Sequence, residues 1–123
     1  FLIPLIVSQA LGERDRITVQ DLEPKRDYVY IDDVCRAIEL SVQKTKGYHL
    51  FNIGSGGSYS VREIIEKVQK AAGTKKSVSS VNKVRRNELN DVIADISLIQ
   101  ETWGWEPQIT IEAGLLRCVE DAR

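Results

Sequence analysis

The feature that most constrains the fold is an alternation of helix-like and strand-like segments along the chain. Apolar residues recur at helical spacing in the former, whereas the latter are short and rich in β-branched and aromatic residues. The predicted helices cover about 2–11, 32–46, 61–72, 96–103 and 111–122, and the predicted strands about 17–19, 26–31, 49–53 and 77–81. This alternation favours an α/β fold with a mainly parallel sheet.

Capping signals mark several helix ends. Ser60 and Glu63 have the spacing of a capping box, in which each side chain accepts a hydrogen bond from the other residue's backbone N–H. Gly73 and Gly104 are expected to end two helices, and Thr110 to cap the last one. These local signals predict helix boundaries without reference to the rest of the fold.

The segment RDYVYIDDVCRA, residues 26–37, passes from strand-like to helix-like spacing through two aspartates. Asp32 is expected to be the N-cap of the helix, and Asp33 to favour the positive end of the helix dipole. Asp95 is likewise expected to cap a later helix. Arg26, at the start of the segment, is neither a core nor a capping residue, so a structural role in this junction does not explain why an arginine occurs there.

Length and charge limit the classes of function. With 123 residues the chain is long enough for one domain with a core, and 17 basic against 18 acidic residues provide no field that would attract nucleic acid or an anionic membrane. Cys35 and Cys118 share no metal-ligand spacing, so reduced thiols are expected. The sequence predicts a cytoplasmic protein with no nucleic-acid and no membrane partner.

The start of the chain, FLIPLIV, is apolar throughout but too short to span a bilayer, and it has no basic segment before it. A buried helix is the better interpretation. The chain contains no methionine, and residue 1 falls inside an apolar pattern that is already under way. We therefore expect residues 1–123 to be a piece of a longer protein.

The stretch HLFNIGSGGSYSVRE resembles a dinucleotide-binding fingerprint in part. Gly54 and Gly56 fit, but Tyr59 occupies the third glycine position and no acidic residue ends a second strand about 20 residues on. The loop is therefore interpreted as a tight turn that uses glycine's access to positive φ. No cofactor-binding residue is predicted in this segment.

Other catalytic or metal motifs are not found. His49, the only histidine, is interpreted as a partly buried structural residue because no nucleophile is patterned to it. The sequence has no Walker-type loop, Cys-x-x-Cys pair or His-Glu-x-x-His motif. No catalytic and no metal-binding residue is predicted.

Five motifs in one order resemble a known family. They are Arg-Asp-Tyr-Val-Tyr-Ile-Asp-Asp-Val, Phe-Asn-Ile-Gly-Ser-Gly, Ser-Val-Arg-Glu-Ile, Arg-Arg-Asn-Glu, and a helix that ends in Trp-Gly-Trp-Glu-Pro. Their order is similar to the C-terminal part of the extended short-chain dehydrogenase/reductases, in particular the NAD-dependent nucleotide-sugar epimerases and dehydratases of the UDP-glucose 4-epimerase type. The resemblance covers nearly the whole chain.

The resemblance implies roles for charged residues. Arg26 would reach the diphosphate of a sugar nucleotide, Arg85 would contact a phosphate, and Glu88 would accept from ribose hydroxyls. Arg86 is a close competitor of Arg85. These roles suit the side chains, since guanidinium groups match phosphate oxygens and a carboxylate matches paired hydroxyls.

The resemblance also implies a base-binding segment. Thr18, Val19 and Gln20 would lie along the base, and Leu2 matches a residue of the nucleotide-binding loop. Relatives usually carry a glycine where this chain has Asp21, so the choice of uridine stays open.

On this resemblance, the chain is the substrate-binding lobe plus the last strand–helix elements of a Rossmann-like parallel sheet. Residues 26–57 would pack on an N-terminal Rossmann half, which would bind NAD and supply the catalytic Tyr-x-x-x-Lys pair. The implied function is the nucleotide-sugar-binding portion, most simply for a UDP-sugar, of an epimerase or dehydratase that forms a homodimer. A non-catalytic nucleotide- or protein-binding module and a purely structural lobe remain as alternatives.

Overall fold

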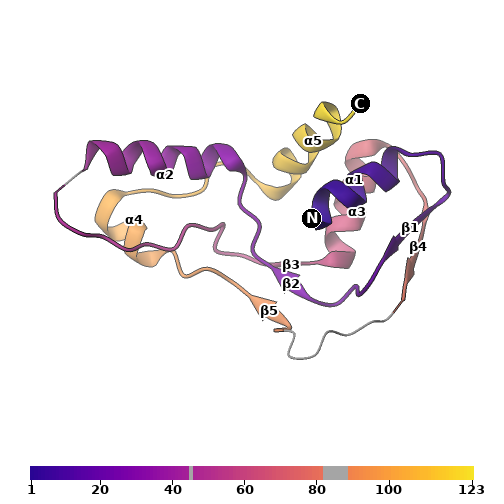
Figure 1. Cartoon of the computed structure of the whole chain (residues 1–123), viewed down its shortest axis with the longest axis horizontal. Helices are drawn as coiled ribbons and strands as arrows, with labels where there is room; N and C mark the ends of the chain where they lie inside the picture. Colours follow the sequence, from indigo (N-terminus) through magenta and orange to yellow (C-terminus); the bar gives the residue numbers. More distant parts are fainter. Residues whose placement is uncertain (45, 82–88) are drawn as a thin grey trace.

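A computed structural model describes residues 1–44, 46–81 and 89–123 of the chain (Figure 1). The described residues form five helices and five short strands. In chain order these are α1 (Leu2–Leu11), β1 (Arg16–Val19), β2 (Lys25–Arg26), α2 (Ile31–Gln43), β3 (Tyr59–Ser60), α3 (Val61–Ala72), β4 (Ser77–Ser80), β5 (Asp91–Val92), α4 (Ser97–Trp103) and α5 (Ile111–Asp121).

The strands form two small sheets. β1 and β4 are parallel, with Ile17 opposite Val78. β2 lies between β3, to which it is antiparallel, and β5, to which it is parallel, so that Lys25 faces Ser60 on one side and Asp91 on the other. The predicted α/β class with parallel pairing is confirmed.

The larger apolar core lies where α1, β1, α3 and α5 meet, at one end of the molecule (Figure 1). On α3 the buried positions recur at spacings of three and four, which places them on one face of the helix. The buried members of this core are Ile6, Val7, Ala10, Ile17, Val19, Val61, Ile64, Ile65, Val68, Ala72, Leu115 and Val119.

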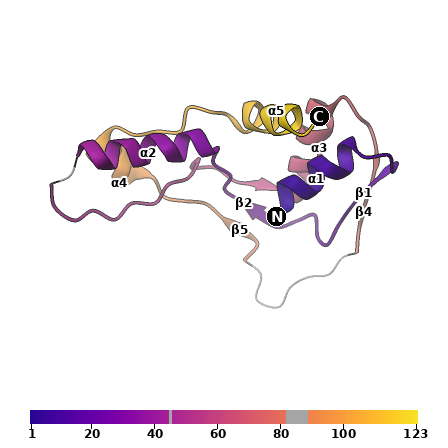
Figure 2. The same ribbon diagram turned by 45° about the horizontal axis from the view of Figure 1, so that its top comes forward.

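A second, smaller core lies at the other end of the molecule, where α2 runs beside α4 (Figures 1 and 2). Its buried members are Ala37, Ile96, Ile99 and Trp105. The three-stranded sheet lies between these two cores (Figure 1). Its middle strand, β2, carries Arg26.

The predicted caps of α3 and α5 are confirmed. The backbone N–H of Ser60 donates to Oε2 of Glu63 at 2.7 Å, and that of Glu63 donates to Oγ of Ser60 at 3.2 Å. Gly73 and Gly104 end α3 and α4 with φ of 68° and 66°, in the left-handed region that favours glycine. Thr110 caps α5 by accepting a backbone N–H at 3.2 Å.

Two predicted strands are wrong in extent. β2 is Lys25–Arg26 and so covers only the first residue of the expected 26–31, and the segment 49–53 forms no strand among the described residues. A strand needs a hydrogen-bonded neighbour, and β5 opposite β2 is only two residues long. Pairing therefore ends where the backbone N–H of Asp27 donates to the carbonyl of Val92 at 3.0 Å.

The predicted caps at Asp32 and Asp95 are also wrong. α2 begins one residue earlier than expected, with Tyr30 at the N-cap, and Asp32 instead pairs with Arg117 of α5 at 2.9 Å. Ile96 is the N-cap of α4, whereas the Asp95 carboxylate accepts from both the backbone N–H and the hydroxyl of Ser97, at 3.0 and 2.6 Å.

Asp33 is fully buried and ties α2 to the segment before α5. Its carboxylate accepts from the backbone N–H of Gln108 and of Ile109, at 3.1–3.2 Å, and pairs with Arg36. Its backbone carbonyl accepts from Nε1 of Trp105 at 3.1 Å. This tertiary role, and not the helix dipole alone, accounts for an aspartate at this position.

Candidate functional site

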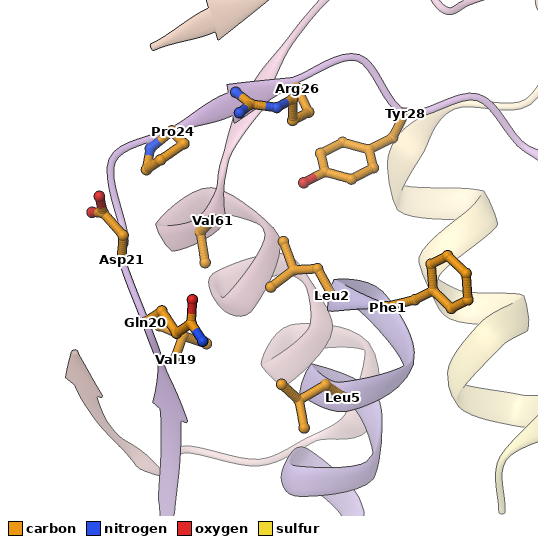
Figure 3. Close-up of a pocket in the computed structure, with 10 residues that line it drawn as sticks. All are labelled: Phe1, Leu2, Leu5, Val19, Gln20, Asp21, Pro24, Arg26, Tyr28 and Val61. Carbon is orange, nitrogen blue, oxygen red and sulfur yellow. The ribbon is translucent and has the colours of Figure 1, made fainter. Parts of the chain in front are cut away.

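A pocket of about 470 Å³ lies between the first turn of α1, the end of β1 and β2 (Figure 3). Its walls are largely apolar, and a cationic and an anionic side chain lie at its edge. The lining residues are Phe1, Leu2, Leu5, Val19, Gln20, Asp21, Pro24, Arg26, Tyr28 and Val61.

Four of the residues expected to contact a nucleotide line this one pocket. Leu2 comes from α1, Val19 is the last residue of β1, Gln20 directly follows it, and Arg26 comes from β2. The structure therefore brings together residues that are up to 24 positions apart in the chain. Their combination of an apolar wall, a carboxamide and a guanidinium can accommodate a flat ring at one side and an anion at another.

Thr18 is not brought to this pocket. Side chains alternate along a strand, and Val19 is buried while Thr18 is exposed. The hydroxyl of Thr18 lies 3.0 Å from that of Ser79 on β4, and the side-chain amide of Gln9 bonds its backbone N–H and carbonyl at 2.7 and 3.1 Å. Thr18 thus holds β1 to its neighbours.

Arg26 is partly buried, and backbone oxygens orient its guanidinium. Nη1 donates to the carbonyl of Lys25 at 2.7 Å and to that of Leu89 at 2.8 Å. Leu89 lies just before β5, so the position of the charge depends on how β2 and this segment are aligned. Arg85, Arg86 and Glu88 lie outside the described residues.

Tyr28 also lines the pocket, and sequence reasoning missed it. Figure 3 shows its ring and hydroxyl directed into the cavity, below Arg26. Burial raises the pKa of Tyr28, while the positive charge of Arg26 acts in the opposite direction. The phenol is therefore a protonated hydrogen-bond donor at neutral pH. The signal was present in the sequence, because residues i and i+2 of an extended segment share a face.

The glycine loop, residues 54–57, binds a carboxylate of the chain itself. Asp27 accepts from the backbone N–H of Ser55 at 2.7 Å and from that of Gly56 at 3.0 Å. A Cβ on Gly54 would lie 2.7 Å from Oδ2 of Asp27, so this glycine allows a close approach of the carboxylate. Gly56 has φ of 74°, as expected for the tight turn. These two amides do not fit a phosphate-binding loop, because they already have an anionic acceptor.

The remaining groups that could carry chemistry are the histidine, the two cysteines and possible metal ligands. His49 is exposed, with Nε2 3.0 Å from the carbonyl of Lys46 and its ring stacked on Phe51 at 5.6 Å, so its predicted partial burial is wrong. Both cysteines are free thiols. Within the described ranges, no three His, Cys, Asp or Glu side chains are grouped as metal ligands.

None of the described helices combines the length and the apolar character needed to cross a membrane.

Residues 2–118 match the sequence model of the family described as GDP-mannose 4,6 dehydratase. Among curated proteins, the chain is 26% identical to dTDP-4-dehydro-6-deoxyglucose reductase of Escherichia coli and 30% identical to UDP-glucose 4-epimerase of Homo sapiens, over 99% and 98% of its length. It is 37% identical to UDP-glucuronate 4-epimerase of Thermodesulfobacterium geofontis over 76% of its length. The chain spans only 38%, 36% and 29% of these relatives.

Solved structures also match nearly the whole of this chain but less than half of their own length. A Thermotoga maritima UDP-glucose 4-epimerase with UDP-glucose is 32% identical, with a TM-score of 0.74 over 94% of this chain and 37% of its own. Pseudomonas aeruginosa RMD complexed with NADPH is 25% identical, with a TM-score of 0.85 over 98% and 42%. A putative epimerase from Burkholderia cenocepacia, at 23% identity and a TM-score of 0.91 over 100% and 41%, shows the shared fold.

Proposed function

Because the chain belongs to the family described as GDP-mannose 4,6 dehydratase, we propose that it forms the nucleotide-sugar-binding portion of an NAD-dependent epimerase or dehydratase. By their names, the three curated relatives reported above epimerise or reduce sugar nucleotides, and two of them act on UDP-sugars. A UDP-sugar is therefore the first substrate to test.

The observation that carries this proposal is the convergence of Leu2, Val19, Gln20 and Arg26 on one pocket. The guanidinium suits a diphosphate, because charge-assisted bonds to phosphate oxygens are strong and can be bidentate. The apolar side chains suit the faces of a base, and the carboxamide can bond its polar edge. Tyr28 adds a hydrogen-bond donor near the cation.

We place Arg85 and Glu88 in the same site, with Arg85 on a phosphate and Glu88 on the ribose hydroxyls. The support is indirect: Leu89, which directly follows this segment in the chain, accepts a hydrogen bond from Arg26 at 2.8 Å. Arg86 remains the alternative phosphate ligand.

NAD would supply reversible hydride transfer, and in our proposal it is held outside residues 1–123. Support comes from the glycine loop, whose amides at Ser55 and Gly56 are bonded by Asp27. We extend the proposal to the arrangement of the whole protein, in which residues 26–57 pack on a cofactor-binding half and two copies form a homodimer. The outward face of α2 supports such packing, because Ile31, Ile38 and Val42 are 62%, 58% and 70% exposed.

The decisive experiment is a titration of the whole protein that carries this chain with UDP, before and after Arg26→Ala. If Arg26 contacts the diphosphate, the substitution weakens binding about ten- to hundred-fold, the loss of a contact of about 1.5–3 kcal/mol. Lysine restores part of the affinity, since it keeps the charge but loses the fork. Arg62→Ala is the matched control. Arg62 lies on α3, forms an ion pair with Glu23 at 3.1 Å and does not line the pocket.

Unchanged affinity in a folded Arg26→Ala variant would refute the assignment of this pocket. Binding of UDP without turnover of any UDP-sugar in the presence of NAD would favour the non-catalytic binding module instead.

A further inference from the structure

Asp27 lies between two pocket residues in the sequence but faces away from the pocket. Arg26 and Tyr28 line the cavity, whereas Asp27 does not. This alternation is that of an extended segment, in which neighbouring side chains point to opposite sides. A change at Asp27 therefore reaches a bound ligand only through its neighbours.

The Asp27 carboxylate joins three segments that are distant in sequence. Oδ1 accepts from the backbone N–H and the hydroxyl of Ser55, at 2.7 and 2.6 Å. Oδ2 accepts from the backbone N–H of Gly56 at 3.0 Å and from that of Ala94 at 3.2 Å. One side chain thus holds the end of β2 against the glycine loop and against the residues that follow β5.

Arg26 depends on the same alignment from the other face of β2. Its guanidinium is bonded to the carbonyl of Leu89, on the segment that enters β5. Space around Asp27 is also limited, since a Cβ on Gly54 would lie 2.7 Å from Oδ2 and 2.5 Å from Cβ of Ala94. A shift of the carboxylate would therefore break its hydrogen bonds to the loop or to the residue that follows β5 by two positions, Ala94.

We propose that Asp27 is a positioning residue of the nucleotide site: its carboxylate fixes the end of β2 so that Arg26 and Tyr28 are held at the pocket. This inference rests on the proposed function. Asparagine has the same shape, but its NH2 group would face N–H donors on one side or the other, because both carboxylate oxygens accept from backbone amides. Asp27→Asn therefore disturbs the alignment without removing volume.

The test is a UDP titration of the whole protein with four variants. Asp27→Asn is expected to weaken binding about ten-fold. Asp33→Asn is the matched control: Asp33 also accepts backbone N–H groups, but it joins α2 to Gln108 and Ile109, which do not line the pocket, and affinity is expected to stay within about two-fold. Arg26→Ala and the double variant Asp27→Asn/Arg26→Ala complete a mutant cycle. If Asp27 acts through Arg26, the double variant binds UDP about as weakly as Arg26→Ala alone, and any further loss of affinity measures the effect that Asp27 has through Tyr28.

The outcomes separate the inference from the function on which it rests. If the unsubstituted protein fails to bind UDP, the proposed function is wrong. If it binds UDP, the inference is overturned by normal affinity in Asp27→Asn, by equal weakening in Asp33→Asn, or by fully additive effects in the cycle. Should Asp27→Asn not fold, Ser55→Ala removes the hydroxyl donor to Oδ1, together with the contacts of that hydroxyl with the backbone of Gly57, and unchanged affinity in that variant also overturns the inference.

Discussion

At the scale of single residues, two aspartates organise this chain. Asp27 and Asp33 each accept backbone N–H groups from segments more than 25 positions away, and Asp33 is fully buried. Donors that lose such an acceptor are left without a partner, which costs more than the bond itself contributes. Both residues lie in the segment 26–37, in which the sequence predicted a cap at Asp32 and a helix-dipole role for Asp33, yet what they bind lies far along the chain.

The close approach of Gly54 to its neighbours leads to a stability prediction. Gly54→Ala places a Cβ 2.5 Å from that of Ala94, and we expect a loss of about 1–3 kcal/mol in the free energy of unfolding. Gly57→Ala is the matched control in the same loop, because a Cβ there meets nothing within 4 Å. Urea unfolding of both variants tests this, and equal stabilities would contradict the close contact.

A second residue-scale prediction separates Arg85 from Arg86. In the proposed site Arg85→Ala weakens UDP binding about ten-fold or more, whereas Arg86→Ala changes it by well under 1 kcal/mol, as a solvated surface charge would. Glu88→Gln weakens the binding of UDP more than it weakens the binding of an analogue without the ribose hydroxyls, because only UDP offers these hydroxyls to the carboxylate. Calorimetry on folded variants decides, and the opposite order for the two arginines would assign the phosphate to Arg86.

At the scale of elements, α3 is the helix in which local and tertiary preferences agree. It has a capping box at one end, Gly73 in the left-handed region at the other, and one face buried in the larger core. Its first residue follows β3 directly, so the cap also fixes where the three-stranded sheet ends. Such agreement across levels is typical of segments whose structure can be read from sequence.

The capping box predicts a dependence of stability on pH. Hydrogen bonds from the backbone and the hydroxyl of Ser60 hold the pKa of Glu63 below its ordinary value. The folded pKa is thus below the unfolded one, so the carboxylate stabilises the fold above the unfolded pKa, and this contribution is lost as pH falls through the folded pKa. Glu63→Gln removes the titration, so the stability difference between the two proteins should shrink on acidification.

Denaturant unfolding at a series of pH values between neutrality and the acid range measures this difference. Glu66→Gln, an exposed position on the same helix, serves as control. A difference that stays constant with pH would show that the charge of Glu63 does not stabilise α3.

At the scale of the whole molecule, two apolar cores lie at opposite ends of an elongated chain (Figure 2). Among the described residues, the smaller core has four buried members. The outer face of α2 beside it carries Ile31, Ile38 and Val42, each more than half exposed. Apolar side chains gathered on one helix face favour association.

We therefore expect residues 1–123, prepared alone, to self-associate or to be poorly stable. Ile38→Glu in the middle of the exposed stripe should reduce self-association, whereas Gln43→Glu, which adds the same charge at the end of α2, should change it less. Sedimentation velocity at several concentrations and thermal melts measure both effects. A monomer that unfolds cooperatively would contradict the prediction.

The sequence by itself determined the elements whose signals are local. The helices and their glycine ends follow from the spacing of apolar residues and from caps within four positions, as Ser60 and Glu63 show. The family resemblance came from motif order, and that resemblance implied that Arg26, Leu2, Val19 and Gln20 belong to one nucleotide site. Strand alternation could have excluded Thr18 and included Tyr28 had it been applied to those segments.

Only the tertiary structure decided the features whose partners are far along the chain. The segment 49–53 has strand-like residues, but a strand forms only where a neighbouring strand pairs with it, and none of the described strands does so there. Asp27 and Asp33 resemble local residues of a strand–helix junction, yet the amides that they bind belong to residues 55, 56, 94, 108 and 109. Long-range satisfaction of buried polar groups leaves no periodic signal in the sequence, so it became visible only once the chain was folded.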